Sequence, residues 1–135
     1  MKKLALLTSI VLFIAINGCK KEKVEDPPKT TAQKIQGKWN ITSIIEKEVS
    51  TNGTFTNNHS GTSGEYVEFK TDGKVYTKRD GQSLESLTYT VNSDTQITID
   101  GDVHDIKTLT ENSFVIYHKS TFQSGYNEIT VTLSK

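Results

Sequence analysis

Apolar side chains recur at every second position through most of the chain after residue 38. Trp39, Ile41 and Ile45 alternate with polar residues, and the same period runs through 67–70 and 129–133. Successive side chains of a β-strand point to opposite faces, so this period predicts strands with one buried face and one wet face. No segment after residue 34 shows the 3.6-residue apolar repeat of an amphipathic helix. The sequence therefore predicts an all-β domain.

Short turn motifs separate these runs. Asp72-Gly73 and Asp100-Gly101 are hairpin signals, and turn-forming residues also occupy 92–94, 110–113 and 123–125. Parallel strands need long crossovers, so turns this short predict about eight antiparallel strands in a meander. Eight such strands avoid exposed edges by closing into a barrel or by stacking as two sheets. We expect an eight-stranded antiparallel up-and-down barrel over residues 34–135.

The inward side of these strands forms the predicted core. Its members are Trp39, Ile41, Val67, Phe69, Val75, Leu87, Tyr89, Val91, Ile97, Ile99, Phe114, Ile116, Ile129, Val131 and Leu133. A closed barrel of eight strands is either filled by such side chains or holds one small ligand. Any ligand would be small and apolar or amphipathic. The candidate ligand-binding residues are Trp39, Phe55, Phe69, Tyr89, Phe114 and Ile116.

Residues 49–64 interrupt the alternation. The stretch is rich in Gly, Asn, Ser and Thr, and Phe55 is its one aromatic residue. A loop this long is usually functional or disordered. Two interpretations stay open: a mobile surface loop, or a lid over the barrel mouth with Phe55 tucked inward.

The first 19 residues resemble the signal sequence of a bacterial lipoprotein. Two lysines precede an apolar run over 4–16, which is too short for a membrane-spanning helix of roughly 20 residues. Ile16-Asn17-Gly18-Cys19 then resembles a lipobox. The resemblance implies a signal peptide over 1–18 and a lipid on the sulfur and the new amine of Cys19. The alternative is a free cysteine with no such role.

Residues 19–33 predict a flexible tether, because they are charged, contain both prolines of the chain and have little to bury. Lys20 stands where an Asp would resemble an inner-membrane retention signal. We therefore expect a lipid-anchored protein of the Gram-negative cell envelope, at the outer membrane, on its periplasmic or surface face. Cys19 is the one cysteine in the chain, so the domain is expected to have no disulfide.

Gly37-Lys38-Trp39 resembles the Gly-x-Trp signature of lipocalins. Further positions in the same order complete the resemblance, namely Ile35, Phe69, Asp72-Gly73, Val75-Tyr76, Tyr89, Val91, Leu109-Thr110, Ile116 and Lys135. It implies a small calycin-type barrel in which the Trp packs across the closed end, near the entry of the chain. It also implies a binding function. The arginine that often stacks on that Trp has no counterpart here, since the one arginine is Arg79.

Several other functions find no support in the sequence. The 16 basic and 16 acidic residues balance, so charge indicates no nucleic-acid surface. The three histidines have no metal-ligand spacing, and 100–111 lacks the Gly that a calcium loop needs at its sixth position. No motif for a catalytic nucleophile or a phosphate-binding loop is present. We expect no catalytic residue, no metal and no cofactor.

Two functions remain. The first is a monomeric, membrane-anchored, lipocalin-like protein that binds a small ligand. The alternative is a structural or interaction lipoprotein with a filled core, which contacts an envelope protein or a glycan through its outer face. Tyr66 and Tyr76 fall on the side opposite the core residues, and Tyr117 does so in part. With Tyr126 they form a candidate patch for such a contact, although tyrosine is also common in strands generally.

Overall fold

The computed structural model describes residues 27–135, so the predicted signal peptide, Cys19 and most of the tether lie outside the described residues. The described part contains one short helix and nine strands. In chain order the elements are α1 (Thr31–Ile35), β1 (Gly37–Ser50), β2 (Gly53–Ser60), β3 (Tyr66–Phe69), β4 (Lys74–Lys78), β5 (Glu85–Ser93), β6 (Gln96–Ile99), β7 (Asp102–Leu109), β8 (Ser113–Phe122) and β9 (Gly125–Ser134).

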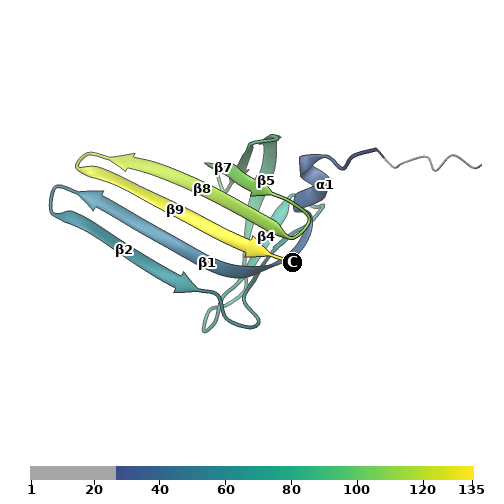
Figure 1. The fold of residues 1–135 in the computed structure, drawn as a ribbon, viewed down its shortest axis with the longest axis horizontal. Coiled ribbons are helices and arrows are strands. Elements are labelled where there is room, and N and C mark those ends of the chain that lie inside the picture. Colours follow the sequence, from purple (N-terminus) through teal and green to yellow (C-terminus); the bar gives the residue numbers. More distant parts are fainter. Residues whose placement is uncertain (1–26) are drawn as a thin grey trace, which may run out of the picture.

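Eight of the strands close into an antiparallel up-and-down barrel, which confirms the predicted fold. Strands β3 to β9 pair in sequence order, and β1 joins the two ends of the series. It pairs with β3 through Gly37–Asn40 on one edge and with β9 through Asn40–Ser50 on the other. Figure 1 shows that β1, β8 and β9 are much longer than the strands opposite them.

The ninth strand, β2, shows that both loop interpretations of residues 49–64 are wrong over most of that stretch. Residues 53–60 pair with the distal half of β1 and extend its sheet beyond the barrel (Figure 1). The segment is polar on both faces, so it lacks the apolar alternation by which the other strands were predicted. Gly53, at φ +127°, follows the two-residue turn between β1 and β2. Phe55 is 69% exposed, so its predicted inward position is also wrong.

A β-bulge changes which side of β1 faces the core. The pairing of β1 with β9 shifts between Ile41 and Ser43, and one extra residue in a strand reverses the side on which all later residues lie. Ile44 is consequently buried, with 8% of its surface exposed, whereas Ile45 is 41% exposed. The prediction that Trp39, Ile41 and Ile45 share one face of this strand was therefore wrong beyond Ile41.

Helix α1 covers one end of the barrel. Thr30 caps it, accepting a hydrogen bond from the Gln33 amide, while the Gln33 side chain accepts one from the Thr30 amide. The Thr31 hydroxyl donates to Asp94 across 2.6 Å, and Ile35 is fully buried. Residues 31–33, which the sequence placed in the tether, are thus helical. Within 27–135 no helix has the length and apolar character needed to cross a membrane.

Candidate ligand site in the barrel

The barrel interior contains a cavity of about 240 Å³. Its aliphatic and aromatic lining comes from seven of the strands, namely Ile41, Ile44, Val67, Phe69, Val75, Leu87, Ile99, Ile116, Ile129, Val131 and Leu133. Drug-sized ligand sites typically occupy roughly 300–1,000 Å³. This cavity therefore suits a smaller molecule, or one that leaves part of itself outside the mouth.

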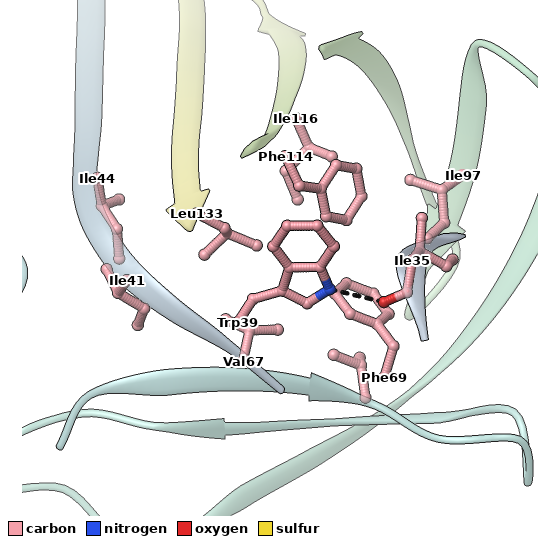
Figure 2. Packing of buried hydrophobic residues seen from close by; sticks show 11 residues of the cluster. Ile35, Trp39, Ile41, Ile44, Val67, Phe69, Ile97, Phe114, Ile116 and Leu133 are labelled. Atoms are coloured by element: carbon pink, nitrogen blue, oxygen red, sulfur yellow. Dashed lines mark hydrogen bonds between the residues drawn. The ribbon is translucent and has the colours of Figure 1, made fainter. Parts of the chain in front are cut away.

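The floor of the cavity is an aromatic cluster at the closed end. Figure 2 shows the Trp39 indole at its centre, between Leu133 and Ile35. The Trp39 and Phe114 ring centroids are 5.5 Å apart, and those of Phe114 and Phe69 are 5.6 Å apart. The indole Nε1 donates to the Ile35 carbonyl across 2.7 Å (Figure 2), so its one polar group is satisfied although the side chain is fully buried.

The six predicted ligand-site residues separate into three groups. Phe69 and Ile116 line the cavity. Three others lie outside its lining: Trp39 and Phe114 pack in the floor, and Tyr89 packs edge-on against Phe69 at 5.2 Å. Phe55 lies on the exposed strand β2, on a separate part of the sheet.

Lys135 covers the outer side of the floor. Its ammonium lies 4.1 Å from the centroid of the Trp39 ring and donates to the Gln36 carbonyl across 3.3 Å. This cation–π contact places a lysine over the Trp39 ring in a chain whose one arginine is Arg79. The contact between Lys135 and Trp39 was not predictable from the sequence, because 95 residues lie between the two.

Six polar residues also line the cavity. They are Glu46, Thr77, Arg79, Gln82, Glu85 and His104. Burial lowers the pKa of His104, which keeps its imidazole neutral at pH 7. This set could not be predicted from the sequence, because none of its members belongs to a motif and Glu46 and His104 lie far from the other four in the chain. A ligand in the cavity would meet both acidic and basic groups as well as the apolar lining.

A buried carboxylate fixes the loops that follow β2 and β4. Glu65 is 3% exposed and accepts backbone hydrogen bonds from Asp80 at 2.9 Å and Thr62 at 2.7 Å. His59 Nε2 lies 2.8 Å from the same carboxylate. These two backbone bonds, together with the His59 contact, lower the pKa of Glu65 to about 2. Glu65 was missed in the sequence because nothing around it distinguishes it from a surface glutamate.

We expect Glu65→Gln to lose the acid-dependent part of the stability that this carboxylate provides. Because the pKa of Glu65 is lower in the folded state than in the unfolded chain, its contribution is complete above about pH 4.5 and decreases as the pH falls towards about 2. Urea unfolding at a series of pH values should show a flatter decrease for the variant over this window and lower stability at pH 7. The exposed Glu111→Gln is the control. Identical pH dependence in wild type and Glu65→Gln would contradict this role.

Lysines cover the outward tyrosines that were predicted as a possible contact patch. The pairs and their distances from Nζ to the ring centroid are Lys38 and Tyr66 at 3.7 Å, Lys70 and Tyr76 at 4.6 Å, Lys107 and Tyr117 at 4.9 Å, and Lys119 and Tyr126 at 3.7 Å. A glycan stacking on these rings would have to displace the lysines. Each of these four tyrosine rings thus already contacts a lysine of the same domain.

A family model and a solved structure are similar to this chain. A model of the lipocalin-like domain family matches residues 35–116, which is more than half of the chain. A solved structure of bovine odorant binding protein, a deswapped triple mutant, is similar at 20% identity and a TM-score of 0.46, over 76% of this chain and 74% of that one. No curated protein matches. The matched region contains the Gly37–Trp39 signature and covers more than half of the chain, so the chain belongs to the lipocalin-like domain family.

Proposed function

We propose that this protein is a monomeric, lipid-anchored binding protein of the bacterial envelope that holds a small apolar or amphipathic molecule in its barrel. The observation that carries the proposal is the interior cavity of about 240 Å³, apolar in its lining and edged by charged residues. Lipocalin-like domains are typically binding modules without catalytic activity, which agrees with the absence of a catalytic motif in the sequence. An apolar cavity in a preformed barrel gains binding free energy by removing apolar ligand surface from water.

The lining also indicates the shape of the ligand. Aliphatic side chains surround the inner part, so an alkyl chain or a small ring system fits there. Arg79 and Glu85 belong to the same lining and offer a charged partner of either sign to a polar headgroup. We therefore favour an amphipathic ligand whose apolar end lies against Phe69 and Ile116.

Filling the cavity should abolish ligand binding without unfolding the barrel. Val131→Phe adds a ring inside the cavity, whereas Thr130→Phe adds the same ring to the outer face of the same strand. The fluorescent apolar dye N-phenyl-1-naphthylamine is a suitable probe. We expect wild type and Thr130→Phe to bind it at one site, and Val131→Phe to lose at least about tenfold in affinity, which corresponds to about 1.4 kcal/mol.

Equal dye affinity in Val131→Phe and wild type, with both folded by circular dichroism, would contradict binding inside the barrel. Native mass spectrometry of the protein purified from its own envelope then identifies the natural ligand by its mass.

The membrane anchor and the location are proposed from the sequence. Cys19 follows an apolar run and a Gly, and a tether over 20–30, which ends where α1 begins, would place the domain a few nanometres from the lipid surface. Lys20 favours the outer membrane. The lipid on Cys19 would hold the barrel near envelope lipids, which are themselves a source of small amphipathic molecules.

One observation favours the alternative function, an interaction lipoprotein. Within residues 27–135, strand β2 pairs with β1 alone, so its other edge presents free backbone groups. Such an edge can accept a strand from a partner protein. A photo-crosslinking residue at Asn58, introduced in cells, should capture one reproducible partner if this function holds, and no single partner if the barrel acts alone.

A further inference from the structure

Two histidines from consecutive strands meet on the inner side of the sheet. His104 lies on β7 and lines the cavity, and His118 lies on β8. Asp105 pairs with Tyr117, which places the two histidines next to each other across the strands, immediately beyond the last paired residues. Their ring centroids are 4.8 Å apart, with an angle of 34° between the ring planes.

Backbone carbonyls fix the tautomer of both rings. His104 Nδ1 lies 3.0 Å from the carbonyl oxygen of Asp102, and His118 Nδ1 lies 2.8 Å from that of Val103. A carbonyl oxygen can only accept a hydrogen bond, so each Nδ1 carries the proton and donates. In this tautomer the free lone pair of each ring is on Nε2. Among the residues that the structure describes, neither Nε2 has a hydrogen-bond partner.

This arrangement is the one that metal-binding histidines usually have. One ring nitrogen donates to a carbonyl, which orients the ring and makes the other nitrogen a better ligand. His59 provides the contrast within the same chain, because its Nε2 is already 2.8 Å from the Glu65 carboxylate.

We propose that His104 and His118 form a two-histidine site for a divalent transition metal of the class that prefers imidazole, such as Zn²⁺ or Cu²⁺. Both ligands would bind through Nε2. Within residues 27–135 no group of three or more His, Cys, Asp or Glu converges on one point, so water or a bound molecule would complete the coordination. Because His104 lines the cavity, an exogenous ligand atom can reach the metal from the barrel interior. The site does not depend on the apolar ligand proposed above.

Zinc titration followed by NMR of the imidazole rings tests this site. The full chain is used with Cys19→Ser, so that the thiol cannot bind zinc. Before zinc is added, the ring ¹⁵N shifts should report the Nδ1–H tautomer for His104 and His118. One equivalent of Zn²⁺ should then shift the ring signals of these two residues and leave those of His59 in place.

His104→Gln and His118→Gln should each weaken zinc binding by at least about tenfold, whereas His59→Gln should leave the affinity unchanged. Circular dichroism verifies the fold of each variant. The proposal is overturned if zinc affinity survives both substitutions. It is also overturned if the wild-type rings show the Nε2–H tautomer, or if zinc shifts all three histidines alike; these readings need no variant to fold.

Discussion

Trp39→Ala is expected to lower the free energy of unfolding by about 3–5 kcal/mol, the usual cost of removing a large buried aromatic side chain. The Trp39 side chain is fully buried and contacts Phe114, and the Phe114 ring in turn contacts Phe69. Its Nε1 also holds the last carbonyl of α1, at Ile35. Removing the indole therefore leaves a cavity in the floor and releases the helix that covers this end of the barrel.

Urea unfolding, followed by circular dichroism of the strands, measures this effect. Lys135→Ala is the matched control, since it removes the charge above the same ring without opening a cavity, and a cation–π contact at an exposed residue contributes about 0.5–1 kcal/mol. If Trp39→Ala has the same free energy of unfolding as Lys135→Ala, or a higher one, the stability of the floor does not depend on Trp39.

Cys19→Ser is expected to abolish lipid modification. Serine has no thiolate to form the thioether, so the lipid-modified residue that precedes cleavage would not arise, and the apolar run over 4–16 would stay on the chain. Each buried CH₂ of an acyl chain contributes about 0.8 kcal/mol of membrane affinity, and stable anchoring needs at least two chains or signals. The variant should therefore carry no palmitate and should lose the membrane affinity that the acyl chains provide.

Radiolabelled palmitate incorporation and cell fractionation measure this outcome. Lys20→Asp is the control next to the same cysteine: it should keep the label but move the protein towards the inner membrane. Undiminished palmitate labelling of Cys19→Ser would contradict lipidation at this sulfur, and loss of the label in both variants would indicate a general export defect.

The barrel could be predicted from the sequence because most of its strands have one apolar and one polar face. The alternation of apolar and polar residues indicates which face of a strand is buried. The predictions were therefore wrong wherever burial does not follow a strict period of two. Strand β2 is polar on both faces and was mistaken for a loop. The bulge after Ile41 reversed the inward side of β1, and nothing in the local sequence marks its position.

The candidate site was predictable only in its apolar part. Phe69 and Ile116 line the cavity because they follow the alternation. The charged residues among the lining, the Glu65 network and the His104–His118 pair depend on contacts between different strands and loops. Pairing between strands creates such contacts, and pairing is a property of the whole sheet that no single motif records.

Methyl NMR of the protein with bound N-phenyl-1-naphthylamine tests the central claim that a small apolar molecule binds inside the barrel. The account predicts intermolecular NOEs from the dye to methyl groups of the inward residues Ile44, Ile116 and Val131. NOEs confined to exposed methyl groups such as those of Leu84 and Val103, with none to the inward set, would contradict it.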